Sequence, residues 1–327
     1  HRSGAQPVLA MSYYPNEGNA LWAQYSTAAI IHTLNLYSRY SFDYPYPIAI
    51  SVNGPVGGME YPMICFNGPR PEADGTYSAR TKYALISVVI HEVGHNYFPM
   101  TVNSDERQWT WMDEGINSFL EAQTEYLWEE GFPAGAQGMP NVLDSITSYM
   151  TSEEQVPIMT NSESVKQFGP NAYAKPTAAL TVLRETVMGR ELFDFAFKEY
   201  AKRWMFKRPT PSDFFRTMED ASGVDLDWFW RGWFYTTDHV DIALTSVREY
   251  RLSTKDPNVE APLSRERKAV RQPEPPTVTG NKAQGLQTYM DKHPDAKDFY
   301  DENDEFVVNN KDLNDFETYK QELKEPD

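Results

Sequence analysis

One short run of the sequence, VVIHEVGHNYFPM at residues 88–100, constrains the fold more than any other. It places His91, Glu92 and His95 inside an otherwise apolar stretch whose spacing predicts a helix. Because a helix turns once in about 3.6 residues, two histidines four apart project from the same face. Two neutral imidazoles on one face can hold zinc, and the glutamate between them lies close enough to act on a water at the metal. A helix with two structural histidines is the alternative that this run leaves open.

The composition of the 327-residue chain fits one large domain or two ordinary ones, since 40% of its residues are hydrophobic and can form a packed core. Its net charge of −17 argues against nucleic acid as a partner, because phosphates would be repelled. No uncharged apolar run is long enough to be a transmembrane segment.

The start of the chain and its cysteine content bear on its origin. The chain begins at His1 without a signal peptide, so we expect a mature or excised piece of a longer protein. The single cysteine, Cys65, excludes an intramolecular disulfide and leaves the compartment open. Of the possible locations, we favour the cell envelope or secretion over the cytoplasm.

Hydrophobic periodicity predicts a mainly helical body with a small sheet in its amino-terminal part. The apolar run at 47–55 ends in Asn-Gly-Pro, which predicts a strand that enters a turn, and the pattern at 240–252 predicts a terminal strand. We therefore expect an α+β fold that is mainly α. The predicted helices cover residues 19–40, 79–98, 109–130, 139–151, 173–188, 190–206, 211–222 and 225–235.

The last part of the chain differs from this body, and we predict a boundary that separates residues 1–250 from an acidic linker or extension at 251–327. Residues 255–280 are rich in proline and charge, which indicates a linker or an extended arm. Residues 281–327 carry about twice as many acidic as basic side chains, which is typical of a solvated or loosely ordered tail. The extension is expected to be partly extended or helical.

A catalytic zinc site requires a third protein ligand, because such sites take three and leave a position for water. The run WMDEGINSF on the next predicted helix supplies Glu114, and eighteen residues separate it from His95. Asp113 is a rival ligand, and a surface-exposed acidic pair is a further alternative, so the spacing alone leaves the third ligand open. Glu121, two turns further along the same face, is expected either to accept a hydrogen bond from a ligand histidine or to form a structural salt bridge.

Four phrases in one order make the chain resemble the aminopeptidase N-like gluzincin metallo-aminopeptidases, the family that includes leukotriene hydrolase. HEVGH and the glutamate of WMDEG have the family spacing, and GGMEY at 57–61 resembles its G-x-M-E-N phrase. NAYAKPTAAL at 171–180 resembles the Tyr-x-Lys phrase, and residues 213–234 resemble the helices that close the catalytic domain. The resemblance implies a thermolysin-like zinc peptidase catalytic domain. The chain departs from the family at Tyr61, where most members have Asn, and at Pro176-Thr177.

The resemblance also implies a role for each residue of the metal site. It implies one zinc ion held by His91, His95 and Glu114, with Glu92 as the general base that takes a proton from the metal-activated water. Tyr173 matches the family tyrosine that donates a hydrogen bond to the developing oxyanion.

The GGMEY phrase is implied to bind the substrate. Glu60 would pair with the charged α-amino group of a peptide and so restrict hydrolysis to free amino termini. Gly57 and Gly58 would let an extended substrate backbone lie close to the chain, and Met59 belongs to the same substrate-binding phrase.

These inferences predict a zinc-dependent aminopeptidase that hydrolyses the amino-terminal peptide bond of peptides through a metal-activated water. The expected partners are peptides with a free amino terminus and additional domains of a longer natural chain, because the family's amino-terminal β-rich domain is expected to be missing. Two alternatives remain: a thermolysin-like zinc endopeptidase, which has no use for Glu60, and a non-catalytic peptide-binding module that keeps the fold.

Overall fold

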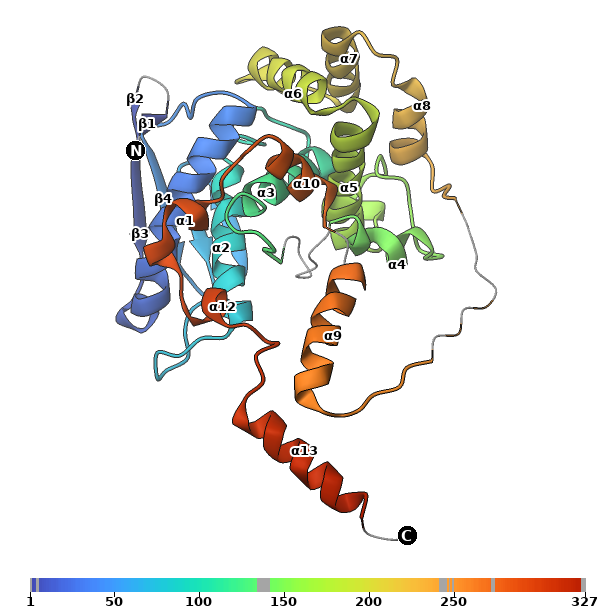
Figure 1. The fold of residues 1–327 in the computed structure, drawn as a ribbon. Coiled ribbons are helices and arrows are strands. Elements are labelled where there is room, and N and C mark those ends of the chain that lie inside the picture. The colour runs from blue at the N-terminus through green and yellow to red at the C-terminus, as the bar shows by residue number, and fades with distance from the viewer. Residues whose placement is uncertain are drawn as a thin grey trace. The chain divides into compact units, whose positions relative to one another are not determined.

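The chain forms two compact units (Figure 1). The computed structural model describes residues 2–3, 6–133, 142–240, 246, 248, 250–271 and 274–324. The first unit consists of residues 1–239 and 275–296, and the second of residues 240–274 and 297–327. The domain boundary expected at residue 250 stays a prediction, although residues 275–296 belong by their contacts to the first unit.

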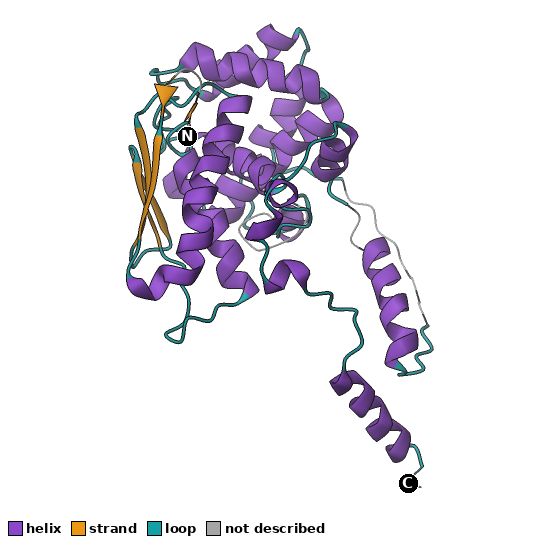
Figure 2. Cartoon of the chain, turned by 60° about the vertical axis from the view of Figure 1, so that its left-hand side comes forward, coloured by secondary structure: helices purple, strands orange, loops and turns teal. Residues whose placement is uncertain are grey.

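A four-stranded sheet lies at one side of the first unit, with helices on one of its faces (Figure 2). Its three parallel strands are followed by one antiparallel edge strand, β5. The strand predicted at 47–55 is β4, and the GGMEY phrase forms β5. In spatial order the strands are β3 (Leu9–Tyr13), β4 (Ile48–Asn53), β6 (Ile64–Asn67) and β5 (Gly58–Tyr61), and a separate pair is β1 (Arg2–Ser3) with β2 (Gln6–Pro7).

Helices α1 (Asn19–Tyr40) and α2 (Ala79–Gly94) contact each other and the sheet. Helix α1 has the predicted bounds and connects the parallel strands β3 and β4, which need such a crossover. Helix α2 begins after Ser78, whose hydroxyl accepts the backbone N–H of Thr81. It ends at Gly94 rather than at residue 98, because the residue before Pro99 is disfavoured in a helix and proline has no N–H to donate.

The other helices of the body are present, most of them shorter than predicted. Helix α3 (Glu114–Glu125) follows a 3₁₀ turn at Thr110–Met112, and together they replace the predicted helix at 109–130. Of the pattern at 139–151, residues 139–141 lie outside the described residues, as does most of the predicted strand at 240–252. The remaining helices are α4 (Thr147–Met150), α5 (Lys175–Val182), α6 (Arg190–Trp204), α7 (Pro211–Ser222), α8 (Asp227–Trp230), α10 (Pro276–Ala283) and α11 (Tyr289–Lys292). Turns of π-helix lie at Pro170–Ala174, Leu183–Val187 and Arg231–Tyr235.

Helices α10 and α11 return to the first unit through specific contacts. Arg190, the first residue of α6, donates to the backbone oxygen of Thr277 at 2.6 Å and to Asn281 Oδ1 at 2.9 Å. Tyr289 stacks on Trp128, with ring centroids 4.3 Å apart. These contacts join residues far apart in the sequence, so the composition of residues 275–296 did not predict them.

The second unit is also helical. Helices α9 (Pro257–Arg271) and α13 (Asn310–Glu322) contact each other, and α12 (Phe299–Glu302) lies between them in the sequence. Arg265 of α9 forms a salt bridge with Asp304. Helix α9 lies in the segment 255–280 that was expected to be a linker or an extended arm, and Pro257 is its first residue, where no proline N–H is needed. The assignment of this segment as a linker stays a prediction.

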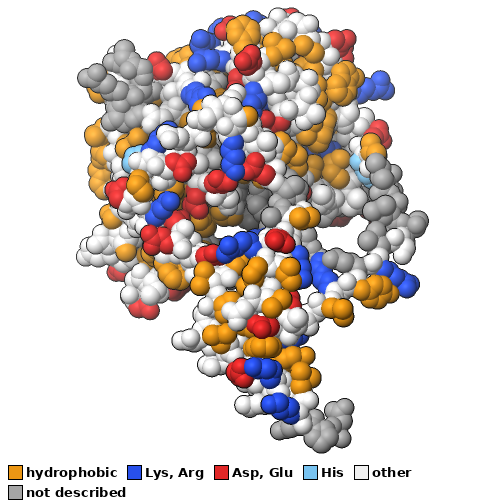
Figure 3. Space-filling view, viewed as in Figure 1, with side chains coloured by type: hydrophobic (Ala, Val, Ile, Leu, Met, Phe, Trp, Pro, Cys, Tyr) orange, Lys and Arg blue, Asp and Glu red, His pale blue; other side chains and the backbone are white. Residues whose placement is uncertain are grey.

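The surface mixes charges of both signs. On the face shown in Figure 3, acidic and basic side chains lie among one another rather than in separate patches. In the part of the chain that the structure describes, no helix has the length and apolar character that a membrane crossing requires.

Candidate active site

Three side chains converge where α2 ends and α3 begins. His91 Nε2 and His95 Nε2 lie 3.0 Å apart, and Glu114 Oε2 lies 3.1 Å from the first and 3.3 Å from the second. A tetrahedral ion with bonds of about 2.0–2.1 Å spaces its ligands about 3.3–3.4 Å apart, so this triangle of donor atoms has nearly the size that zinc requires. The structure therefore brings together the three residues that were predicted as ligands.

Glycines lie where α2 and α5 each approach α3 closely. A Cβ atom at Gly94 would lie 2.3 Å from Asn117 Oδ1, and Asn117 Nδ2 donates to the backbone oxygen of His91 at 2.9 Å. At the start of α3, a Cβ atom at Gly115 would lie 2.5 Å from Pro176 Cγ. Gly94 thus allows α2, which carries the histidines, to approach α3, and Gly115 allows α5 to approach the start of α3 beside Glu114.

The outer nitrogen of each histidine has a fixed acceptor. His91 Nδ1 lies 2.8 Å from Glu121 Oε2, so the predicted hydrogen bond to Glu121 is present. His95 Nδ1 lies 2.9 Å from the backbone oxygen of Phe98 and 3.1 Å from Asp113 Oδ1. These acceptors favour the proton on Nδ1 and leave Nε2 free to face the centre of the triangle. Asp113, the rival ligand, lies on the other side of His95 from the triangle.

Carboxylates reverse the effect of burial on both histidines. Burial lowers the pKa of an imidazole, because its charged form loses hydration. At His91, Glu121 and Glu114 more than offset burial and hold the pKa well above its ordinary value. At His95, Asp113 and Glu114 outweigh burial and raise the pKa to about 10. These carboxylates therefore stabilise a positive charge at the two histidines, which either a proton or a metal cation can supply.

Glu92 faces the triangle, and one of its oxygens has no partner. Glu92 is only 6% exposed. Its Oε2 atom is buried and accepts no hydrogen bond from the described residues. Burial raises the pKa of Glu92 to about 7, against the opposite effect of His91 and His95. A Cβ atom at Gly58 would lie 2.1 Å from Glu92 Oε1. Glu92 thus fills the space beside Gly58 that we expected a substrate backbone to use.

Tyr173 lies beside His91 on the π-helical turn Pro170–Ala174. The ring centroids of Tyr173 and His91 are 5.9 Å apart and their planes are inclined by 26°. Burial and the Glu114 carboxylate raise the pKa of Tyr173 well above its ordinary value, so its hydroxyl keeps its proton at neutral pH and can donate a hydrogen bond. Single π-helical turns of this kind frequently occur at functional sites.

The triangle opens into a cavity of about 500 Å³. Met59 and Glu60 of strand β5 line it, as does Gly58. Atoms of Glu60, Glu92 and His95 that could bind a metal lie within 4.8 Å of one another, so Glu60 is beside the triangle. Gly57 does not line the cavity, and its role in substrate binding stays a prediction.

The cavity also includes residues that the sequence did not predict. Two loops, 105–110 and 161–164, contribute them, and hydrogen bonds join the loops: Ser162 Oγ donates to the backbone oxygen of Glu106 at 2.6 Å. Neither loop has a periodic pattern that would place its side chains. Phe168 had no signal either, because it precedes the helix predicted at 173–188; in the structure its ring centroid lies 6.1 Å from that of Tyr173. The residues that were missed include Glu106, Arg107, Thr110, Ser162, Glu163 and Phe168.

Comparison with known proteins identifies the family. Residues 22–233 match the model of the peptidase family M1 domain. The chain belongs to peptidase family M1. This confirms the resemblance inferred from the four phrases. Relatives of this M1 chain include aminopeptidase M1-D of Oryza sativa subsp. japonica, 25% identical over 225 residues that cover 64% of this chain and 25% of the relative. Leukotriene A-4 hydrolase of Xenopus laevis is 24% identical over 192 residues, which cover 56% of this chain and 30% of the hydrolase.

Solved structures show the same fold in other M1 proteins. Aminopeptidase A of Legionella pneumophila, in complex with aspartic acid, matches with a TM-score of 0.60 and 16% identity over 72% of this chain and 27% of that one. The M1 zinc metallopeptidase of Deinococcus radiodurans matches with a TM-score of 0.55 and 16% identity over 76% of this chain and 52% of that one. The predicted fold class, mainly helical with a small sheet, is confirmed. The M1 chain spans only a quarter to a third of the length of the curated relatives named above.

Proposed function

We propose that this M1 chain is the catalytic domain of a zinc-dependent aminopeptidase, which hydrolyses the amino-terminal peptide bond of peptides. One observation carries the proposal: the donor triangle of His91, His95 and Glu114 lies next to the unpartnered carboxylate of Glu92. Membership of the M1 family supports it, as does a 23% identical relative named alanine/arginine aminopeptidase in Saccharomyces cerevisiae. A thermolysin-like arrangement of the domain is part of the same proposal.

Zinc suits the donor set better than magnesium or calcium, which prefer shells made of oxygen alone. The triangle offers two imidazole nitrogens and one carboxylate oxygen, and its edges of 3.0, 3.1 and 3.3 Å fit a small cation. Asp113 and Glu121, behind the two histidines, would keep the rings oriented toward the ion. Zinc held there would supply Lewis acidity, which lowers the pKa of a water at the metal to about 7.

Glu92 is the general base and acid of the proposed reaction. Its carboxylate lies beside the triangle, where it takes a proton from the attacking water and delivers it to the leaving amine. Burial raises the pKa of the Glu92 carboxyl, which makes the carboxylate a stronger base for that proton. Tyr173 keeps its proton and donates a hydrogen bond to the carbonyl oxygen as negative charge develops on it, which is worth about 3–4 kcal/mol in comparable sites.

Glu60 favours the aminopeptidase over the endopeptidase. Beside Glu92 and His95 it can pair with the charged α-amino group of a substrate, and an internal peptide segment has no such charge. Strand β5 is an edge of its sheet, so an extended peptide can bind along its backbone near Gly58 and Met59. A non-catalytic peptide-binding module would have no use for the buried Glu92. We therefore rank the peptide-binding module below the aminopeptidase.

The proposed partners are peptides with a free amino terminus and, because the match covers only 25% and 30% of the two relatives named above, further domains of a longer natural chain. Nucleic acid is not among them, given the net charge of −17. A location in the cell envelope or outside the cell stays a prediction.

Comparing a free peptide with its amino-terminally acetylated form tests the proposal. We expect the zinc-loaded chain to cleave the free peptide, to lose activity when a chelator removes the metal, and to leave the acetylated peptide intact. Glu114→Ala should abolish the binding of one zinc per chain, whereas Asp113→Asn should retain it. Equal cleavage of both peptides would favour the endopeptidase, and binding without cleavage would favour the peptide-binding module.

A further inference from the structure

The cavity contains more carboxylates than the proposed function uses. The function employs Glu60, Glu92 and Glu114, and Asp113 supports His95. In the part of the chain that the structure describes, the only lysine or arginine that lines the cavity is Arg107. The six carboxylate residues that line the cavity are Glu60, Glu92, Glu106, Asp113, Glu114 and Glu163.

Two of these carboxylates, Glu106 and Glu163, have no part in the proposed function, and of the two only Glu163 has a charged partner among the described residues. Glu163 forms a salt bridge with Arg107. The side chain of Glu106 is exposed and has no ion pair or hydrogen bond with any described residue, although its backbone oxygen accepts from Thr110 Oγ1 at 2.9 Å and from Ser162 Oγ at 2.6 Å. The backbone of this loop is therefore held in place while the Glu106 carboxylate stays available for a ligand.

Glu106 and Glu60 occupy different parts of one cavity. Glu60 belongs to the cluster with Glu92 and His95 whose atoms lie within 4.8 Å of one another, and Glu106 lies outside that cluster. Partial burial and then the charge of Glu60 raise the pKa of Glu106, so the two carboxylates are close enough to interact. A residue whose α-amino group pairs with Glu60 would project its side chain away from this cluster into the rest of the cavity.

We propose that Glu106 selects peptides whose first residue has a cationic side chain, lysine or arginine. The inference rests on the proposed function, because it takes Glu60 as the anchor of the α-amino group. Lysine carries its charge at the end of a four-carbon stem, so its two positive charges can pair with two separate carboxylates. Phe168, which is 44% exposed and lines the cavity, offers an apolar face for the stem. An acidic first residue would be repelled by Glu106.

A pair of peptides that differ only in this charge tests the inference. Lys-Ala-Ala and norleucine-Ala-Ala have stems of the same length, and only the first has a side-chain ammonium. We expect the chain to favour the lysine peptide in kcat/KM, mainly through KM, and we expect Glu106→Gln to reduce that preference about fivefold. Asp105→Asn is the matched control: it removes the same charge from the same loop, but Asp105 does not line the cavity and lies near Arg208. This control should leave the preference unchanged.

Binding gives a readout that does not require turnover. In the zinc-loaded Glu92→Gln protein, calorimetry should give a lower Kd for the lysine peptide than for the norleucine peptide, and adding Glu106→Gln should bring the two Kd values together. Equal affinities in the Glu92→Gln protein, or a difference that survives Glu106→Gln, would overturn the role of Glu106 and leave the proposed aminopeptidase intact. If neither peptide were bound or cleaved, the proposed function would fail, and this inference with it.

Discussion

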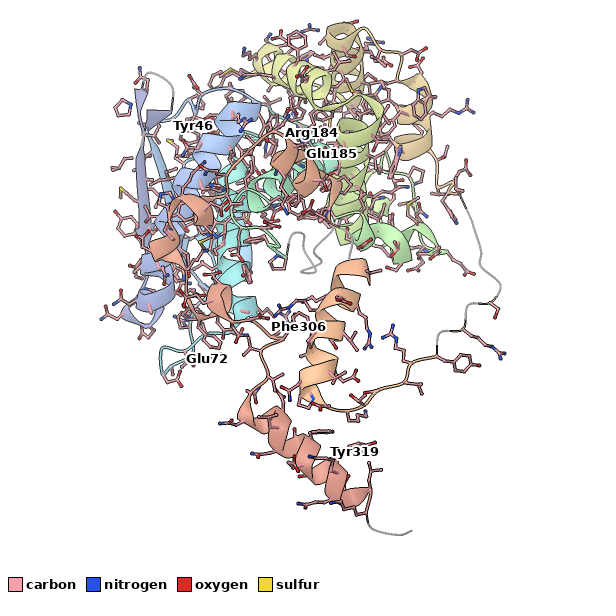
Figure 4. All side chains as sticks on the ribbon, viewed as in Figure 1. Tyr46, Glu72, Arg184, Glu185, Phe306 and Tyr319 are labelled. Atoms are coloured by element: carbon pink, nitrogen blue, oxygen red, sulfur yellow. The ribbon has the colours of Figure 1, made fainter. Side chains whose placement is uncertain are left out.

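Two groups of buried charge in the first unit use the same kinds of side chain, but only one of them is balanced. In the arginine network, which we define as Arg184, Glu185, Arg190 and Asp194, two arginines meet two carboxylates; Figure 4 labels Arg184 and Glu185. Arg184 donates to both oxygens of Asp194 at 2.6 and 2.8 Å, and Glu185 accepts from Arg184 and from Arg190 at 2.6 and 2.7 Å. In the cleft, by contrast, the described residues that line the cavity include six carboxylates and, as the only lysine or arginine, Arg107.

The difference separates a structural cluster from a functional one. In the arginine network each charged group has a partner of opposite sign, so the network holds α6 in place and, through Arg190, holds α10 as well. In the cleft the carboxylates outnumber the cationic side chains His91, His95 and Arg107, and one oxygen of the buried Glu92 has no partner, which is costly. Buried charge that the protein does not neutralise by itself therefore indicates a place where a metal or a charged substrate binds.

The largest expected effect is on the unpartnered carboxylate of the cleft. Glu92→Gln preserves the shape of the side chain but cannot accept a proton, so turnover should fall roughly 10²–10⁴-fold. The free energy of unfolding should stay the same or rise, because a negative charge is removed from an acidic cluster. Steady-state kinetics and urea unfolding measure these two quantities. Retention of more than about a tenth of the turnover would contradict the role of Glu92.

The same kind of deletion in the arginine network should act on stability instead. Arg184 is 1% exposed, and Arg184→Met leaves Glu185 and Asp194 short of a partner, so the free energy of unfolding should fall by about 3–5 kcal/mol. Arg203→Met is the matched control, because Arg203 is 46% exposed and lies 3.8 Å from Asp220; its loss should cost less than about 1 kcal/mol. Urea unfolding gives both values. If both variants lost the same free energy of unfolding, or if folded Arg184→Met bound zinc more weakly, the arginine network would not be a structural cluster separate from the functional cleft.

The parts of the molecule that were predictable from the sequence have local signals. The predicted bounds of α7 are those observed, because Thr210 and Asp213 form a capping box at its start and Gly223 ends it at a φ of 69°. The pairing of His91 with His95 follows from helical periodicity alone.

The unpredicted parts depend on contacts between distant residues or lie in irregular loops. The return of residues 275–296 requires Arg190 to meet Asn281, and strands β3, β5 and β6 are too short for a clear alternating pattern. Glu106 lies in a loop, where no periodicity indicates the direction of a side chain. Sequence reasoning therefore predicted the donor triangle and the part of the cavity wall that strand β5 forms, but not the part that the two loops form.

Two glycines extend the comparison, because each allows a charged side chain to lie against the backbone. A Cβ atom at Gly58 would lie 2.1 Å from Glu92 Oε1, and one at Gly280 would lie 2.2 Å from Arg190 Cζ. Gly58→Ala should displace the Glu92 carboxylate and lower turnover by about tenfold or more, since a shift of about 1 Å in a reacting group can cost that much. Gly280→Ala should disturb the arginine network and lower the free energy of unfolding by about 1–3 kcal/mol without changing turnover. If both variants lost the same turnover and the same free energy of unfolding, the cleft and the arginine network would not differ as proposed.

The smallest expected effect concerns a histidine that has no carboxylate to oppose its burial. His32 Nε2 lies 3.0 Å from the backbone oxygen of Thr124, and the ring packs edge-on against Trp128. Burial, together with the nearby charges of Lys292 and His293, lowers the pKa of His32 to about 4, the opposite of the direction at the cleft histidines.

A folded-state pKa below the unfolded value means that the unfolded chain binds the proton more readily. The stability contributed by neutral His32 is therefore present above about pH 6.5 and is lost as the pH falls toward about 4. His32→Gln keeps an N–H that can donate to Thr124 but cannot be protonated. Because the ring is only partly enclosed, we expect the unmodified chain to lose about 1 kcal/mol more than the variant between pH 7 and pH 5. Urea unfolding at both pH values measures this difference, and the cleft histidines cancel from it because they are the same in both proteins. An identical pH dependence of the two proteins would show that the pKa of His32 is not lowered, and the contrast between a histidine among carboxylates and a histidine without them would then be lost.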